Sequence, residues 1–292
     1  MSELRPETPA RRPETARPRG EAEPEVPPPS PDELRTIAHQ LAALPRHAGA
    51  TFTDDPQLGA LLVRQDGIGP GGNYAAELRW TPQAWRASLA RVVALYRRWG
   101  TWPTILVVDP LDRPIGLADA LERIGWRAIQ RERVLWVGRA SIVPHLDPRM
   151  RIEAVQPRSV ATHEAVEREI FGLPGAEAEG RRAALAAALA AGDLRAFVVH
   201  LDDAPIAVAR LSLGPGVAGI YGLGVRAPWR RQGYGTLLTT IVTRAGMATG
   251  HRLVWLSVAE ENEAAERTYA RLGFAEAFRW SRHLGTPDDA DA

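Results

Sequence analysis

The stretch Arg230-Arg231-Gln232-Gly233-Tyr234-Gly235-Thr236 decides the fold of this 292-residue chain. It follows an apolar run at residues 220–225 and leads into an amphipathic pattern at residues 233–248, which predicts a strand, a glycine-containing turn and a helix. The first amides of a helix have no acceptor within it, and with the helix dipole they form a site for a polyphosphate. Gly233 and Gly235 would let a phosphate approach the backbone, and Arg230 and Arg231 could pair with it or remain solvated. From the residues alone, a pyrophosphate site and an ordinary turn both remain open.

A second motif lies further along the chain, after a strand-like run at residues 253–258. It reads Asn262-Glu263-Ala264-Ala265-Glu266-Arg267-Thr268-Tyr269, followed by Ala270-Arg271-Leu272-Gly273-Phe274. The two motifs, in this order and with a strand between them, resemble the GNAT superfamily of N-acetyltransferases. That family has a phosphate loop of the form Arg/Gln-x-x-Gly-x-Gly/Ala, and a later Asn followed by Tyr seven positions on and then Gly-Phe. The resemblance covers residues 150–284.

The resemblance implies that coenzyme A lies between the strand ending at Val225 and the strand starting at Leu253, which splay apart. Its pyrophosphate would bind the backbone of residues 232–236. The backbone N–H of Val225 would polarise the thioester carbonyl, and Tyr269 would protonate the departing thiolate. The cofactor-binding residues expected from the resemblance are Leu223, Val225, Arg230, Arg231, Gln232, Gly233, Tyr234, Gly235, Thr236, Asn262 and Tyr269. The co-substrate is acetyl-CoA, and no metal is expected.

Some of these residues have a simpler interpretation. Tyr269 could merely pack against Leu272 at i+3, and Asn262 could be a helix cap, a role that is compatible with cofactor binding. The chain also departs from the family, because many relatives carry a Glu or Asp on the strand before the phosphate loop. Residues 219–225 contain no carboxylate. The general base is therefore unassigned; Glu260, Glu261 and His251 are nearby in sequence, and Tyr221 could line the acceptor pocket.

The remaining periodicity predicts an α/β (α+β) protein. The resemblance implies a GNAT-like mixed, mostly antiparallel twisted sheet flanked by helices. A first helix should begin at Ser30-Pro31-Asp32-Glu33, which has the form of a capping box. Further helices are expected at residues 82–99, 116–124, 159–171, 177–191, 233–248 and 262–272. Strands are expected at residues 104–108, 132–137, 151–155, 195–200, 206–213, 219–225, 253–258 and 275–281.

A weak internal repeat appears at an offset of 148 residues. It aligns residues 104–108 with 252–256, and Arg123-Ile124-Gly125-Trp126 with Arg271-Leu272-Gly273-Phe274. The phosphate loop then falls on residues 82–87, which contain no glycine, and Tyr269 falls on Leu121. The chain is therefore predicted to contain two tandem copies: a degenerate GNAT-like domain at residues 31–147 and a catalytic domain at residues 148–285. The first would support the second or form one wall of the acceptor pocket.

Composition limits the classes of function. Residues 1–30 are rich in Pro, Arg and Glu and predict a disordered tail, and residues 286–292 predict a flexible one. There is no cysteine and no long apolar run, so a cytoplasmic location without membrane contact is expected. A net charge of +1 argues against a nucleic-acid partner. All 36 basic residues are arginine, so no lysine can act as a base.

The leading hypothesis is an N-acetyltransferase that moves the acetyl group from acetyl-CoA directly to an amine of a small molecule or peptide. The alternatives are an acetyl-CoA-binding regulatory module without turnover, for which the missing carboxylate is the best support, and an interaction scaffold built on the aromatic first half. The sequence identifies neither the acceptor nor the oligomeric state.

Overall fold

The computed structural model of the protein describes residues 26–65, 72–139 and 147–285. The predicted tails at residues 1–30 and 286–292 therefore lie outside the described residues, except for residues 26–30. No helix in the described ranges is both long and apolar enough to cross a membrane.

The elements of the first half, in chain order, are α1 (Pro31–Ala43), the 3-10 helix η1 (Leu44–Ala48), β1 (Thr51–Asp55), β2 (Ala60–Arg64), β3 (Tyr74–Ala76), α2 (Trp85–Arg98), β4 (Thr104–Asp109), α3 (Leu117–Arg123) and β5 (Arg127–Val137). The predicted capping box is confirmed, because Ser30 Oγ accepts from the N–H of Glu33 at 3.3 Å and Ser30 N–H donates to Glu33 Oε2 at 2.8 Å. Strands β1 and β2 were not predicted. Residues 73–80 were expected to be strand-like and contain β3, and β5 begins five residues before the strand expected at residues 132–137.

The elements of the second half are β6 (Met150–Ala154), α4 (Val160–Phe171), α5 (Ala178–Ala191), β7 (Leu194–Leu201), β8 (Ala204–Leu213), β9 (Val217–Val225), α6 (Tyr234–Ala248), β10 (Leu253–Ala259), α7 (Glu263–Arg271) and β11 (Ala275–Leu284). Every one of them was predicted, with ends that differ by at most three residues. Helix α5 ends as expected at Gly192, whose φ of 80° is readily adopted only by glycine.

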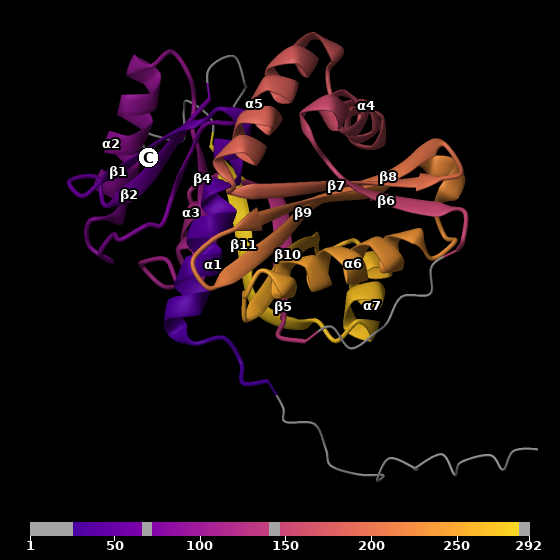
Figure 1. The fold of residues 1–292 in the computed structure, drawn as a ribbon. Coiled ribbons are helices and arrows are strands. Elements are labelled where there is room, and N and C mark those ends of the chain that lie inside the picture. Colours follow the sequence, from indigo (N-terminus) through magenta and orange to yellow (C-terminus); the bar gives the residue numbers. More distant parts are fainter. Residues whose placement is uncertain (1–25, 66–71, 140–146, 286–292) are drawn as a thin grey trace, which may run out of the picture.

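All these strands form one 11-stranded sheet in the order β1-β2-β3-β4-β11-β5-β10-β9-β8-β7-β6 (Figure 1). Only β3–β4 and β9–β10 pair in parallel among the named strands; the other neighbours are antiparallel. The predicted mixed, mostly antiparallel sheet flanked by helices is therefore confirmed.

Helices cover both faces of the sheet. Ser212 of β8 contacts Gln40 of α1, and Arg210, two residues earlier, contacts Glu167 of α4. Residues two apart on a strand share a face, so α1 and α4 lie on the same side of the sheet. Helix α6 packs on the opposite side through Leu238 and Val242. In Figure 1, α4 and α5 lie above strands β6–β9, and α6 and α7 lie below them.

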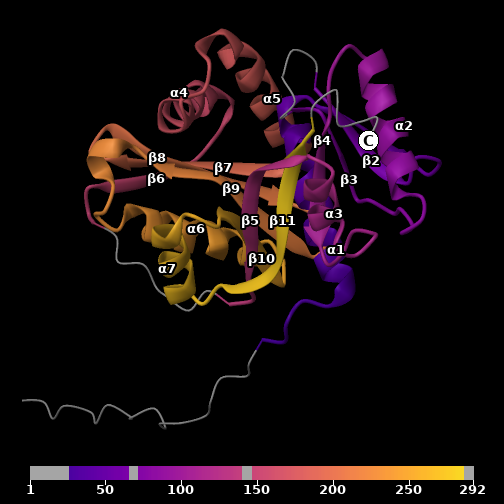
Figure 2. The same ribbon diagram turned by 180° about the vertical axis from the view of Figure 1, so that it is seen from behind.

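The last strand of each half is built into the other half. Strand β5 pairs with β10 from Glu132↔Ala259 to Val254↔Val137, and β11 pairs with β4 from Leu284↔Thr104 to Arg279↔Asp109. The two exchanged strands also pair with each other along the centre of the sheet, where Figure 2 shows them side by side. The sequence did not predict this exchange.

The strand order repeats on both sides of this centre. The series β4, α3 and β5 recurs as β10, α7 and β11 about 148 residues later. In each series the first strand pairs in parallel with the strand that precedes it in the sequence. This arrangement fits two tandem copies. The duplication itself, and the domain boundary near residue 148, remain proposals.

We expect that neither half folds alone into a stable monomer. Each would lose the strand that the other half inserts, and a sheet edge would be left open at its centre. Residues 26–147 and 148–285 should be produced separately and together, and followed by size-exclusion chromatography and circular dichroism. Co-produced halves should associate one to one. A single half that elutes as a monomer and unfolds cooperatively would contradict this expectation.

Candidate active site

A gap opens between β9 and β10 in the middle of the sheet. The two strands pair in parallel only from Leu253↔Val217 to Leu256↔Ile220. Beyond these pairs, β9 continues to Val225 against β8, and β10 continues to Ala259 against β5. The strands therefore separate toward their carboxyl ends, as the family resemblance implied.

The backbone of Val225 faces this gap. The N–H of Arg226 donates to Ile206 O at 2.9 Å, so the polar groups of residue 226 point toward β8. In an antiparallel pair the polar groups of successive residues point to opposite sides, so those of Val225 point away from β8. Its carbonyl accepts from Arg230 Nε at 2.9 Å on that side. The N–H of Val225 is thus directed into the gap.

The turn after β9 directs the start of α6 at the same gap. It passes through the 3-10 helix η5 (Ala227–Trp229), and then through Arg231 and Gly233, which have φ of 60° and 88°. Gly233 is the N-cap of α6 and provides no side-chain hydrogen bond. The N–H groups of Tyr234, Gly235 and Thr236 therefore have no acceptor within the helix, and they add to the positive end of its dipole.

A cavity of about 540 Å³ lies between this turn and α7. It is lined by Ile170, Phe171, Leu223, Gly224, Val225, Arg230, Arg231, Gly233, Gly235, Thr236, Thr239, Asn262, Ala264, Ala265, Thr268 and Tyr269. We call it the loop cavity. It brings together nine of the eleven residues predicted to bind the cofactor. The other two do not line it: Gln232 Nε2 donates to Pro228 O at 3.0 Å, and Tyr234 packs against the core beneath α6.

Two glycines have different roles in this turn. Gly233 has a positive φ that side chains rarely adopt. Gly235 has no such constraint, and a Cβ placed there would meet only Val225 Cγ2, at 3.9 Å. The space above Gly235 is therefore open to a bound group.

Both proposed roles of Asn262 and Tyr269 are compatible with the geometry. Asn262 caps α7, since its Oδ1 accepts from the N–H of Ala265 at 3.2 Å, and it also lines the loop cavity. Tyr269 packs against Phe274, with ring centroids 5.9 Å apart, and lines the loop cavity as well. Burial raises the pKa of Tyr269 above its ordinary value, so its hydroxyl is protonated near neutral pH, as a general acid requires.

A second cavity of about 390 Å³ adjoins the first and shares Phe171, Leu223 and Tyr269 with it. We call it the central cavity. The first half of the chain contributes Leu41, Leu44, Pro45, Tyr74, Leu106, Gln130 and Glu132 to its lining, and the second half contributes Phe171, Ile220, Tyr221, Gly222, Leu223, Trp255, Leu256, Ser257, Tyr269, Trp280 and Arg282. The expectation that Tyr221 lines a pocket is met by this cavity. Tyr269 lies where the two cavities meet.

The carboxylate that β9 lacks is found on β5. Glu132 lines the central cavity, where its carboxylate accepts hydrogen bonds from Ser257 Oγ and, at 2.6 Å, from Gln130 Nε2. The candidates considered from the sequence, Glu260, Glu261 and His251, line neither cavity. Glu132 was missed because it becomes part of the site only through the strand exchange. The sequence contained one weak signal for Glu132. Residues 130 and 132 are both polar and share a face of β5, whereas the residues near the end of this strand are mostly buried.

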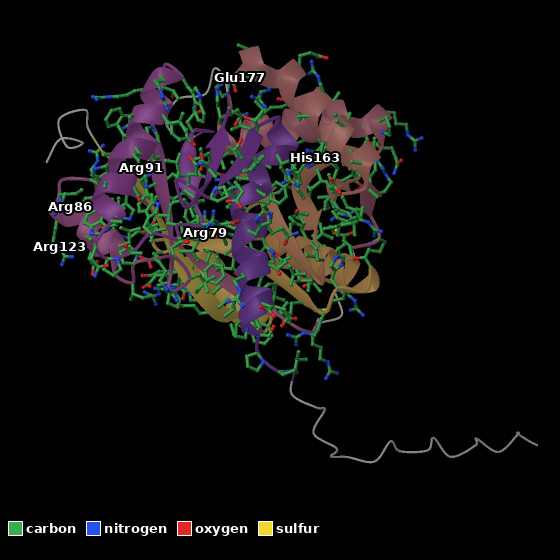
Figure 3. All side chains as sticks on the ribbon, turned by 90° about the vertical axis from the view of Figure 1, so that its left-hand side faces the viewer. Arg79, Arg86, Arg91, Arg123, His163 and Glu177 are labelled. Carbon is green, nitrogen blue, oxygen red and sulfur yellow. The ribbon has the colours of Figure 1, made fainter. Side chains whose placement is uncertain are left out.

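The helix that ends at Phe171 is anchored by a buried polar cluster. On α4, Glu167 forms an ion pair with Arg210 of β8, and the Nδ1 of His163 lies 3.9 Å from Glu167 Oε2. Figure 3 labels His163 on this helix. His163 is fully buried. Burial, and to a lesser extent the charge of Arg210, lower the pKa of His163 to about 3.

The buried histidine should make the protein sensitive to acid. Between about pH 6.5 and 3 the unfolded chain binds a proton at His163 that the folded chain does not, so the free energy of unfolding falls as pH falls, by up to about 1.4 kcal/mol per pH unit. In urea denaturation, the loss of stability from pH 7 to pH 5 should be about 2 kcal/mol smaller in His163→Gln than in the unmodified protein. Equal losses would contradict this assignment.

Among the described residues, no group of three or more His, Asp or Glu side chains is placed to hold a metal ion. The groups of the two cavities that can act chemically include the amides at the start of α6, the N–H of Val225, the Tyr269 hydroxyl and the charged side chains Arg230, Arg231, Glu132 and Arg282.

Residues 162–274 match the family model described as "Acetyltransferase (GNAT) family". The matched segment contains β9, the turn, α6, β10 and α7, and therefore the whole loop cavity. No protein in a search of curated sequences matches the chain.

Solved structures share the fold over most of the chain. A GCN5-related N-acetyltransferase from Kribbella flavida is 20% identical, with a TM-score of 0.66 over 86% of this chain and 95% of that one. A GCN5-related N-acetyltransferase from Sphaerobacter thermophilus is 20% identical, with a TM-score of 0.59 over 88% and 93%. A tandem GNAT protein from the clavulanic acid biosynthesis pathway is 21% identical, with a TM-score of 0.58 over 77% of each chain.

Proposed function

We propose that this protein transfers the acetyl group of acetyl-CoA to the amine of a small molecule, in keeping with the match of residues 162–274 to the GNAT acetyltransferase model. The observation that carries the proposal is the position of Tyr269. It lies between a cavity built around the amides of a helix start and a second cavity that contains a carboxylate.

The loop cavity has the chemistry to hold acetyl-CoA. The amides of Tyr234, Gly235 and Thr236 and the positive end of α6 favour a pyrophosphate, and Arg230 and Arg231 add charge at the cavity wall. The open space above Gly235 admits a phosphate close to the backbone. The gap beyond Leu256 and Ile220 leaves room for an extended arm between the strands.

The chain's own groups account for the proton movements of acetyl transfer. When bound, acetyl-CoA supplies the thioester. The amine nitrogen forms a bond to the acetyl carbon while the carbon–sulfur bond breaks. Val225 N–H is directed to stabilise charge on the carbonyl oxygen, Tyr269 donates its proton to the leaving sulfur, and Glu132 takes the proton released by nitrogen. Tyr269 then regains a proton from solvent.

The central cavity suits a small acceptor. Its volume of about 390 Å³ and its aromatic walls match those of a pocket for a compact ligand. Residues of the first half line part of this cavity. This supports the proposal that the degenerate copy forms one wall of the acceptor site. We place the reaction in the cytoplasm, since a chain without cysteine needs no oxidising compartment.

Turnover separates an enzyme from a regulatory acetyl-CoA-binding module. The chain contains no cysteine, so a thiol reagent reports released coenzyme A without background from the protein. We expect thiol release from acetyl-CoA that depends on an added primary amine, with the N-acetyl product detected by mass spectrometry. Tight acetyl-CoA binding without release, across a broad panel of amines, would support the regulatory module instead.

A further inference from the structure

The central cavity contains one negative and one positive side chain. Among its lining residues, Glu132 and Arg282 are the charged ones, and the remainder are apolar, aromatic or neutral. The described part of the wall therefore has no net formal charge. A simple amine would match only one of the two charged groups.

The two charged groups occupy different places along the cavity. Glu132 on β5 is adjacent to β10, whereas Arg282 lies one strand further from the gap, on β11, opposite Gln130. The register places Glu132 opposite Trp280, two residues from Arg282. Side chains in this diagonal relation have Cβ atoms roughly 7 Å apart. A ligand with two separated charges could contact both.

Each charged group is held in place by neighbours. Gln130 and Ser257 donate to the carboxylate of Glu132, and Trp280 Nε1 in turn donates to Ser257 Oγ at 2.9 Å. A carboxylate retains further acceptor sites when it has two donors. The guanidinium of Arg282 lies 4.6 Å from the ring centroid of Tyr74 and 5.9 Å from that of Trp280. Stacking fixes its plane. A guanidinium has five N–H donors, so it can bind a planar carboxylate in addition to the partners it already has.

Much of the rest of the wall is apolar or aromatic, and it comes from both halves of the chain. Leu41, Leu44 and Leu106 line the side nearer the first half, and Phe171 and Trp255 line the other. Such a lining excludes water around an apolar body and strengthens charge pairing at the two polar groups.

We propose that the acceptor is an amino acid with an apolar side chain, or a close analogue: an amine that also carries a carboxylate. This proposal rests on the proposed acetyl transfer. The ammonium group pairs with Glu132 on the side of Tyr269, and the carboxylate pairs with Arg282 on the side of β4. The ammonium loses one proton to solvent before the nitrogen attacks, and Glu132 takes the second proton as the amide forms. Acetylation removes the positive charge, so the product keeps only the contact with Arg282 and is released.

Binding can be measured without turnover. The full chain saturated with coenzyme A should be titrated calorimetrically with leucine, phenylalanine and tryptophan, and with isoamylamine, phenethylamine and tryptamine, which lack only the carboxylate. At least one amino acid should bind about 10- to 100-fold more tightly than its partner amine, because a charged hydrogen-bonded pair is lost. Amines that bind as tightly as the amino acids, or the absence of binding by every amino acid, would overturn the proposal.

Variants assign the effect to the two side chains. Arg282→Gln should abolish the preference for the carboxylate, whereas Arg279→Gln, an exposed residue of the same strand, should preserve it. Glu132→Gln should weaken binding of the amino acids and the amines alike. If Arg282→Gln proves unstable, 3-phenylpropionate serves as a second measurement: it should compete with phenylalanine in the unmodified protein, and a lack of competition would contradict the role of Arg282.

Failure of this proposal can be told from failure of the proposed function. Acetylation of simple amines with no advantage for amino acids would leave the acetyltransferase standing and remove the acceptor class. A protein that binds amino acids but releases no coenzyme A with any amine would keep the ligand class and remove the transfer reaction.

Discussion

Replacing Tyr269 by phenylalanine should lower kcat for acetyl transfer by about 100-fold or more, while the Kd for acetyl-CoA changes by less than about threefold. The ring lies between the two cavities and packs on Phe274, and phenylalanine preserves this packing. The substitution removes only the hydroxyl group, and with it the proton that would be donated to the leaving sulfur. Steady-state thiol release together with calorimetric titration of acetyl-CoA would measure both quantities.

A matched variant separates the acid from the packing. Tyr269→Leu removes the proton and the ring, so it should lower kcat to a similar extent and also lower the thermal midpoint of unfolding. A Tyr269→Phe enzyme with unchanged kcat would show that the hydroxyl takes no part in the reaction, and that the tyrosine serves only to pack α7 against the residue after Gly273.

Replacing Gly235 by aspartate should weaken acetyl-CoA binding by about 100-fold or more. The new carboxylate would occupy the space above the first turn of α6, and like charges at about 4 Å repel by roughly 4 kcal/mol near a protein surface. The fold should tolerate the change, since a Cβ at this position meets only Val225 Cγ2 at 3.9 Å. An acidic residue also suits a helix start.

Two controls accompany this variant. Gly235→Ala adds volume without charge and should weaken binding far less. Gly180→Asp places the same charge in the first turn of α5, where a Cβ has open space, and should leave acetyl-CoA binding unchanged. Unaltered affinity in Gly235→Asp, measured calorimetrically on protein with an unchanged thermal midpoint, would contradict a phosphate site at the start of α6.

The elements of the second half, and α1 in the first, could be predicted because each is locally specified. The run that becomes β10 is apolar except for Ser257, Gly192 closes α5, and Ser30 with Glu33 opens α1. Strand β1, in contrast, reads TFTDD and has exposed positions at three of its five residues. It is a strand because β2 pairs with it, and no local pattern identifies such an edge strand.

The exchange of β5 and β11 could not be predicted by the same means. A strand with the pattern of β5 satisfies its backbone equally well beside β4 or beside β10, and the choice depends on the packing of distant segments. As a result, only part of the site could be identified from the sequence. The phosphate turn and Tyr269 were found from local motifs, whereas Glu132 and Arg282 belong to the site only because the exchanged strands bring them beside Ser257 and Tyr74.

The first half has a distinct role in the proposed function. Residues 82–87, which align with the phosphate turn, contain no glycine, and the first half lines part of the proposed acceptor cavity, including its carboxylate. The second half would supply the acetyl-CoA site and the acid. An active site assembled in this way requires both halves, which is consistent with the continuous central sheet.

Calorimetric titration of the full chain with acetyl-CoA would show whether the protein binds the acetyl donor at all. We expect one site per chain with a micromolar Kd, formed at the start of α6 in the second half. Two sites would show that the first half also binds the cofactor despite its missing glycines. If acetyl-CoA fails to bind, and the same protein unfolds cooperatively and is therefore folded, acetyl transfer is contradicted as its function.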